Sequence, residues 1–182
     1  MSAIVVGDMQ VRGSVNSGLN GNSAAFNGVD TSLGKYIANN PLPSATLNAL
    51  FSDVTGEENA LSAIHYACVF VYNSNPLNSY QNPRVWISAD VAGGAAVALG
   101  VDPTPASPIN STDMQAVQIV YRDNPPVGVV FSAPSDLPSG LLLGTIPPSS
   151  VKAFWIRRSC QNTVALSADG LAFSVRGATA AA

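Results

Sequence analysis

Ile64-His-Tyr-Ala-Cys-Val-Phe-Val-Tyr72 is the stretch of this sequence that decides the fold class. Apolar, aromatic and β-branched residues follow one another there almost without a polar interruption. Such a run is typical of a β-strand that is covered on both faces. From Ile64 onward the sequence therefore predicts strands, in which successive side chains point to opposite faces of a sheet.

Shorter segments of the same character recur along the rest of the chain. They are Arg84–Ser88, Ala95–Val101, Gln115–Tyr121, Val127–Phe131, Gly140–Leu143, Val151–Arg157 and Leu171–Arg176. Turn-forming clusters such as Asn124-Pro-Pro126 and Pro147-Pro-Ser-Ser150 separate them. Short strands punctuated by proline and glycine predict an all-β protein, an antiparallel β-sandwich of the jelly-roll or Ig-like kind with about eight strands.

The first 43 residues differ from this pattern. They are rich in glycine and asparagine and show no sustained period of a strand or a helix. We expect residues 1–43 to form an extended N-terminal arm that lies along a neighbouring subunit, and residues 44–182 to form the sandwich domain.

Helix content is expected to be small. Ser44 is placed as a helix N-cap, and Leu47, Leu50 and Phe51 follow at the spacing of one helical face. The segment Asp53–Asn59 then indicates a turn or the start of a second short helix.

Composition excludes several classes of protein. The chain has 182 residues, of which 47% are hydrophobic and only 10% charged, with a net charge of −3. This hydrophobicity argues against disorder, and eight basic residues in an acidic chain are too few for a nucleic-acid-binding stripe. No apolar run is long enough to span a membrane, and the N-terminus has no secretory signal pattern. A surface so poor in charge suits a protein covered by neighbouring subunits.

The sequence predicts no catalytic, cofactor-binding or metal-binding residue. His65 is the only histidine, and it precedes Cys68 by three positions, which places the two side chains on opposite faces of a strand. Most carboxylates stand in turns, where their side chains bond to nearby backbone, as expected for Asp102, Asp123 and Asp136. A carboxylate site assembled from distant segments stays open as an alternative, since one sequence does not show spatial convergence.

Cysteine and aromatic residues leave alternatives open. Cys68 and Cys160 lie far apart in the sequence and fit buried, reduced thiols, although a disulfide closing that long loop would also stabilise the chain. Four aromatic residues are expected to pack in the core or to line a sugar-binding face; they are Tyr72, Tyr80, Trp86 and Trp155. Arg157 and Arg158 are adjacent on a strand and should point to both faces.

Segments spread over roughly residues 50 to 180 carry a family resemblance. They are Leu50-Phe-Ser-Asp-Val-Thr-Gly-Glu-Glu58, Tyr66-Ala-Cys-Val-Phe-Val-Tyr-Asn73, Asn82-Pro-Arg-Val-Trp-Ile87, Val97-Ala-Leu-Gly-Val-Asp-Pro103, Val127-Gly-Val-Val-Phe-Ser132, Lys152-Ala-Phe-Trp-Ile-Arg-Arg158 and Phe173-Ser-Val-Arg-Gly-Ala-Thr-Ala180. Together they resemble a family of small β-sandwich structural proteins of tailed bacteriophages. The resemblance implies a virion protein and leaves a place on the head or on the tail open.

The expected function is that of a non-enzymatic structural component of a phage particle. A capsid decoration, or cement, protein is the first hypothesis, and a tail, collar or baseplate protein is the alternative. The expected partners are other virion proteins and copies of the same chain in a homo-oligomer, without nucleic acid, membrane or cofactor. The expected location is the virion, assembled in the bacterial host cytoplasm. A glycan- or host-recognition module is a further alternative, as is an enzyme acting on cell-wall sugar.

Overall fold

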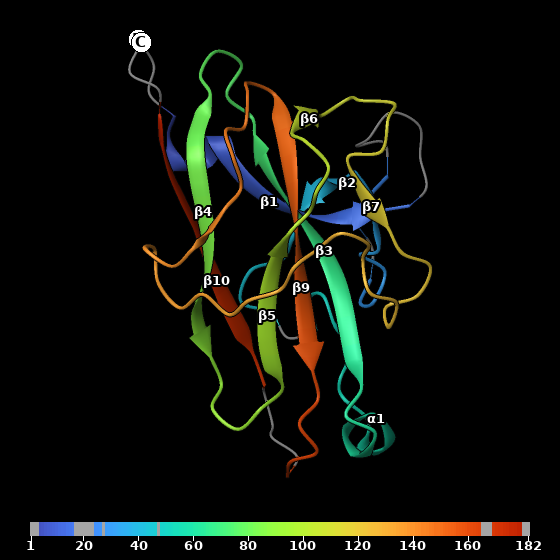
Figure 1. Cartoon of the computed structure of the whole chain (residues 1–182). Helices are drawn as coiled ribbons and strands as arrows, with labels where there is room; N and C mark the ends of the chain where they lie inside the picture. Colours follow the sequence, from blue (N-terminus) through green and yellow to red (C-terminus); the bar gives the residue numbers. More distant parts are fainter. Residues whose placement is uncertain (1–3, 17–23, 27, 47, 165–168, 180–182) are drawn as a thin grey trace.

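The protein is an all-β sandwich, as the sequence predicts. The structure is a computed structural model that describes residues 4–16, 24–26, 28–46, 48–164 and 169–179. Its strands form one larger and one smaller antiparallel sheet that face each other (Figure 1). The only helices among the described residues are the 3-10 turn η1 (Val6–Asp8) and the short α1 (Gly56–Ala60).

The larger sheet is built around one long strand pair. Its strands, in spatial order, are β5 (Ala96–Val101), β9 (Ser150–Ser159), β3 (Ile64–Asn73), β1 (Met9–Val15), β2 (Gly34–Pro41) and β7 (Ala116–Gln118), and β6 (Ser107–Pro108) also pairs with β9. β3 and β9 pair without a break from Ile64 opposite Ser159 to Asn73 opposite Ser150. The apolar run that predicted a doubly covered strand thus lies inside this sheet.

The smaller sheet has three strands. They are β10 (Leu171–Thr179), β4 (Tyr80–Asp90) and β8 (Leu141–Leu142), in that spatial order. β4 is central and pairs with both neighbours, whereas β8 contributes only a two-residue ladder. β10 therefore forms one edge of this sheet.

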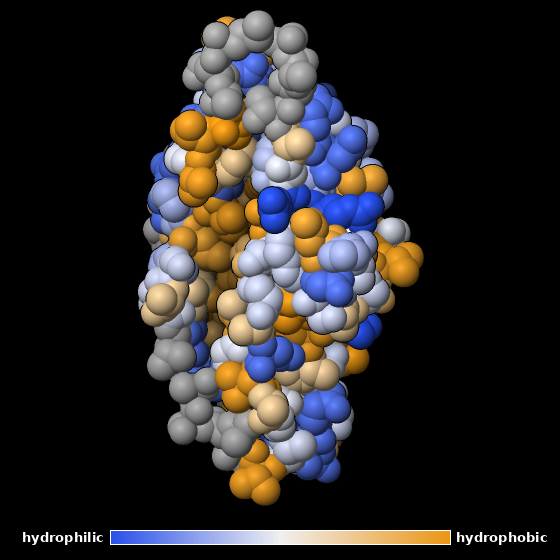
Figure 2. Space-filling view, turned by 90° about the vertical axis from the view of Figure 1, so that its left-hand side faces the viewer, coloured by the Kyte–Doolittle hydropathy of each residue, from blue (hydrophilic) through white to orange (hydrophobic). Residues whose placement is uncertain are grey.

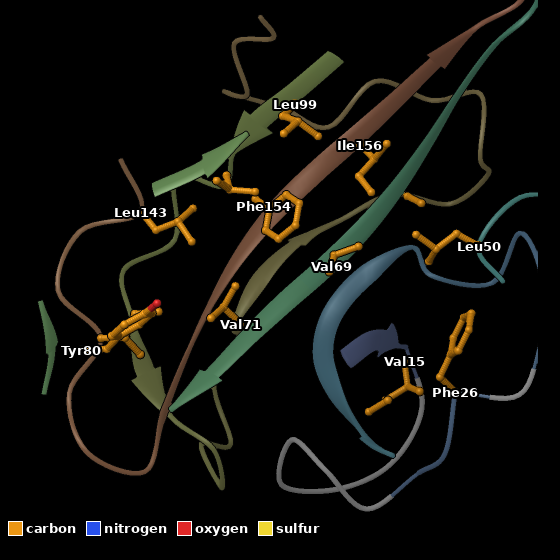
Figure 3. Close-up of a cluster of buried hydrophobic side chains, with 14 residues drawn as sticks. Val15, Phe26, Leu50, Val69, Val71, Tyr80, Leu99, Leu143, Phe154 and Ile156 are labelled. Carbon is orange, nitrogen blue, oxygen red and sulfur yellow. The ribbon is translucent and has the colours of Figure 1, made fainter. Parts of the chain in front are cut away.

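The hydrophobic core lies between the two sheets. Val69, Phe154 and Ile156 project from β3 and β9 into it, and Leu99 from β5 joins them (Figure 3). A second cluster covers the outer face of the larger sheet, where Phe70 and Trp155 are completely buried. β3 and β9 are therefore covered on both faces at their centres, which accounts for the mainly apolar residues there.

The prediction of an extended N-terminal arm is wrong for most of the described residues in that stretch. Met9–Val15 and Gly34–Pro41 are strands of the larger sheet, where β1 pairs with both β3 and β2. Gly13 is needed because a Cβ there would lie 2.8 Å from the ring of Phe26, which packs on this strand. Gly13, which suggested a loose segment, thus permits close packing, while residues 1–3, 17–23 and 27 of the expected arm lie outside the described part of the chain.

Two local predictions also need correction. The described residues near Leu50 and Phe51 form bends and turns in place of the first helix, and Leu47 lies outside the described residues. Val127–Phe131 forms a turn and an irregular segment in place of the predicted strand. The nearest pairing is an isolated bridge between Ser132 and Leu99. Among the described residues no helix has the length and apolar character needed to span a bilayer.

Candidate functional site

Ionisable side chains from five separate segments meet at the end of the sandwich where α1 lies. We call this group the charged cluster; its members are Asp30, Glu58, His65, Arg122 and Arg158. Arg122 is its centre, since its Nη1 lies 2.7 Å from Asp30 Oδ2 and its Nη2 donates to Glu58 Oε1. Two carboxylates from distant segments therefore neutralise one guanidinium. The sequence leaves such a convergence of carboxylates open but predicts neither of these ion pairs.

A capping box places Glu58 at this end of the molecule. The Glu58 backbone N donates to Thr55 Oγ1 at 3.1 Å, and the Thr55 backbone N donates to Glu58 Oε2 at 2.8 Å. This reciprocal pair fixes the first turn of α1. The remaining carboxylate oxygen, Oε1, is left to face Arg122 and His65, so a helix of only five residues positions one side chain of the charged cluster.

Arg158 anchors the segment before α1 to β9. Its Nη1 donates to the Ser52 carbonyl oxygen at 2.6 Å, and its guanidinium lies 4.7 Å from the centre of the Phe51 ring. Arg157, the preceding residue, lies over Phe131 on the opposite side of the sheet. The prediction that the two arginines point to opposite faces is confirmed.

His65 is held neutral by this arrangement. Its Nδ1 accepts from Arg158 Nη2 at 2.9 Å, which leaves the ring proton on Nε2, 3.5 Å from Glu58 Oε1. Burial lowers the pKa of His65, and the nearby charges of Arg122 and Arg158 lower it further. The imidazole therefore serves as an acceptor for a cation and has no free nitrogen lone pair with which to act as a general base.

The carboxylates of the charged cluster are held ionised. A hydrogen bond with the Thr55 backbone lowers the pKa of Glu58 most, and the Thr55 side chain and the charge of Arg122 lower it further. Burial alone would raise the pKa of Asp30, but hydrogen bonds from Ser52 and Arg122 reverse that effect and lower it overall. A shallow hollow opens beside these groups. Arg122 is paired with both Asp30 and Glu58, and Glu58 and Arg158 both contact His65, so the cluster links α1 to the strands β3 and β9.

The Cys68 thiol is remote from this chemistry. Cys68 packs in the cluster on the outer face of the larger sheet, on the opposite side of β3 from His65, as the spacing predicts. Burial raises its pKa well above the ordinary value, so the reactive thiolate is suppressed. Cys68 lies opposite Trp155 of β9, and Cys160 directly follows that strand, five residues or about 17 Å from Trp155. That separation excludes a disulfide between the two buried thiols.

Asp102 makes a second polar site, and its role is structural. The side chain is fully buried and accepts from Trp155 Nε1 at 2.7 Å and from the Val117 backbone N at 3.0 Å. Its other oxygen accepts from the Thr104 backbone N at 2.8 Å, which is the turn bond expected for this residue. The ammonium of Lys152 donates to the Asp102 carbonyl oxygen at 2.7 Å. These bonds join β5, β7 and β9 inside the sheet.

The aromatic residues do not form one exposed face. Trp155 and Tyr80 are buried in the two separate hydrophobic clusters. Tyr72 is half-buried with Arg12 stacked on its ring at 4.9 Å, and Trp86 lies half-buried on β4. The packing interpretation is confirmed for Trp155 and Tyr80, which leaves a sugar-binding face without two of its four expected members.

An exposed apolar surface stands out on the segment that we call the strap, residues 120–134. The strap crosses the outer face of the larger sheet, and three backbone contacts hold it: Arg122 O with Tyr66 N, Ser132 with Leu99, and Pro134 O with Ile87 N. Its side chains that face the sheet, Val129 and Phe131, pack into the outer cluster.

Four large apolar side chains of the strap face solvent. They are Val120, 70% exposed, Tyr121, 67% exposed, Val127, 79% exposed, and Val130, 85% exposed. Single exposed apolar residues are common on monomeric proteins, so the grouping of four on one short anchored segment makes the strap the candidate interaction surface.

Comparison with known proteins identified no relative of this chain. No family model, no curated protein and no solved structure matches it. Within the described part of the chain, no three histidine, cysteine, aspartate or glutamate side chains gather in a way that could hold a metal ion.

Proposed function

We propose that this protein is a non-enzymatic structural component of a tailed-phage particle and that it binds a neighbouring subunit through the strap. The observation that carries the proposal is the exposure of Val120, Tyr121, Val127 and Val130 on one anchored segment. An interface core of this kind is apolar and poor in charge. The resemblance of the predicted strands to small phage structural proteins supports the particle as the place of assembly.

The strap is suited to this role because it is rigidly held. Gly100 lets it lie directly on β5, since a Cβ there would be 2.4 Å from Val129 Cγ1 and 2.8 Å from the Val130 carbonyl oxygen. A preformed surface loses little conformational entropy when a partner binds. The strap therefore presents its apolar side chains in a fixed arrangement, and the sandwich beneath it serves as the scaffold.

The charged cluster and the buried Asp102 site support the proposal in a different way. Both consist of side chains that are paired within the molecule and that join strands or close the end of the sandwich. Such groups stabilise a rigid module that is used through its surface. We place the protein on the capsid as a decoration protein, with the tail, collar or baseplate as the alternative.

Imaging of labelled particles tests the proposal. A label fused to the chain should decorate purified particles, and labels spread over the whole head indicate a capsid decoration protein. Labels confined to one vertex or to the tail support the alternative location. Particles that carry no label, although the fusion protein is folded and abundant in the same cells, would contradict the proposal.

A further inference from the structure

The outer edge of β10 is an unpaired strand edge. β10 bonds to β4 on one side, and no strand among the described residues pairs with its other side. The β10–β4 ladder has two irregularities, and in each the extra residue lies in β4. At the first, the consecutive residues Ala172 and Phe173 pair with Ala89 and Ile87, so one residue of β4 has no partner in β10. β10 itself thus keeps a regular alternation, and its outer edge offers a row of backbone donors and acceptors.

This edge lacks the features that normally prevent pairing. β10 contains no proline and a single charged residue, Arg176. Leu171, Phe173 and Val175 point toward the core but remain only partly buried. Phe173 contacts Phe154 edge-on, with ring centres 5.3 Å apart. Figure 2 shows a hollow with an apolar floor on this side of the molecule. An added strand would cover apolar side chains as well as satisfy the edge.

We propose that β10 of a second copy of this chain pairs antiparallel with β10, around a two-fold axis at Ser174. In this register Phe173 lies opposite Val175 of the second copy. The two-fold axis generates the same pair a second time, with Val175 opposite Phe173 of the second copy. An aromatic residue facing a β-branched residue is a favourable cross-strand combination. Leu171 faces Gly177, where a small residue leaves room for the larger one. A two-fold axis requires one surface to complement itself, and this strand does so.

The charges of β10 also fit a second copy in this register. Arg176 lies opposite Ala172 of the second copy, and the two arginines are separated by four positions, about 14 Å along the strand. The outward face at the axis holds only the two Ser174 hydroxyl groups, which are able to bond to each other. No like charges meet directly, so this pairing avoids the repulsion that charged edge strands impose.

The pairing is expected to be weak in dilute solution. A seven-residue strand pair buries less than the roughly 1,600 Å² of a standard protein interface. A dimer should therefore form only as the protein concentration rises, and copies held near one another by a particle should pair much more completely. The inference deepens the proposed function, on which it rests for its biological role, by naming one contact between copies.

Cysteine crosslinking of the full chain tests the register. Ser174→Cys places two thiols directly opposite each other across the axis, at a distance that a disulfide can span. Ala178→Cys is the matched control on the same strand, since its two copies would lie about 27 Å apart. Mild oxidation should give a covalent dimer of the first variant and none of the second. The native thiols are both buried and should not compete.

A charge at the axis provides an independent test. Ser174→Lys leaves the apolar face of β10 intact but brings two like charges together in the proposed dimer, so the concentration-dependent shift in elution volume should disappear while the unfolding temperature stays the same. Two results would overturn the pairing: no crosslink of Ser174→Cys at any concentration, or equal crosslinking of both cysteine variants. A dimer that forms in solution from a chain absent from particles would contradict the proposed function alone.

Discussion

β9 and β10 are strands of similar length with opposite environments. β9 pairs along both edges, and Phe154, Trp155 and Ile156 at its centre are completely buried. β10 pairs along one edge, and its inward-facing side chains are only partly buried. The same strand geometry thus serves two purposes. β9 and its neighbours supply stability, whereas β10, together with the strap, leaves surface available for other molecules.

Deletion of residues 1–43 should have the largest effect on the stability of the larger sheet, to which β9 belongs. The deletion removes β1 and β2, which leaves one edge of β3 unpaired, and it also removes the buried core residues Val15, Phe26 and Ala38. We expect a chain without cooperative thermal unfolding, as followed by circular dichroism. A truncated chain that unfolds at the temperature of the full chain would mean that the larger sheet does not depend on these strands.

Matched phenylalanine truncations compare the two strands directly. Phe154→Ala should cost about 3–5 kcal/mol of unfolding free energy, since it leaves a cavity in a fully enclosed site. Phe173→Ala, which removes the other ring of the same contact, should cost only about 1–2 kcal/mol because that ring is partly exposed. Denaturant unfolding measures both values. Equal losses would contradict the distinction between an enclosed strand and an edge strand.

Acid should weaken the end of the sandwich where β9 carries Arg158. The pKa of His65 in the folded protein lies below its usual 6.5, so the unfolded chain binds the proton more readily. Stability should therefore be complete above pH 6.5 and fall as the pH drops below that value. A further loss should follow near pH 4 and below, where Asp30 and Glu58 become protonated.

Thermal unfolding of His65→Gln from pH 8 to pH 5 isolates the contribution of the histidine. The glutamine carbonyl oxygen is able to accept from Arg158 and does not titrate. We expect this variant to lose the step below pH 6.5, by an amount smaller than the loss caused by Phe173→Ala. An unchanged step would assign the pH dependence to other groups.

Substitutions on the strap should have the smallest effect on stability. Val127→Ser and Val130→Ser replace side chains that are mostly exposed and should change the unfolding free energy by no more than about 0.5 kcal/mol. Val129→Ser is the control, because its side chain faces Gly100 and the sheet, and it should cost more. A large loss in the first pair would mean that these residues belong to the core.

The sequence predicted those parts of the fold that leave a local pattern. The apolar run of β3 identifies a doubly covered strand, the alternation around Val85 identifies β4, and short segments bounded by turns identify β9 and β10. β1 escaped prediction because Gly13, which resembles a turn residue, is required by the ring of Phe26, a contact across thirteen positions. Tertiary packing decides the conformation there, and local propensity does not.

The candidate sites were harder to predict for a related reason. Asp30, Glu58 and Arg122 form ion pairs across long sequence separations, which produce no period along the chain. The prediction of a turn or a short helix start at Asp53–Asn59 was the one local signal, and it did not identify the ionic partner of Glu58. In the strap, Val127 and Val130 resemble core residues in composition, and only the structure shows that they face solvent.

The occupancy of the chain in purified particles tests the central claim most directly. We predict that the unaltered chain is incorporated, and that the double variant Val127→Ser with Val130→Ser, although folded and equally abundant in the cell, is largely lost from particles. Quantitative mass spectrometry of both particle preparations gives the result. Equal occupancy of the two chains would contradict the claim that the exposed side chains of the strap bind a neighbouring subunit.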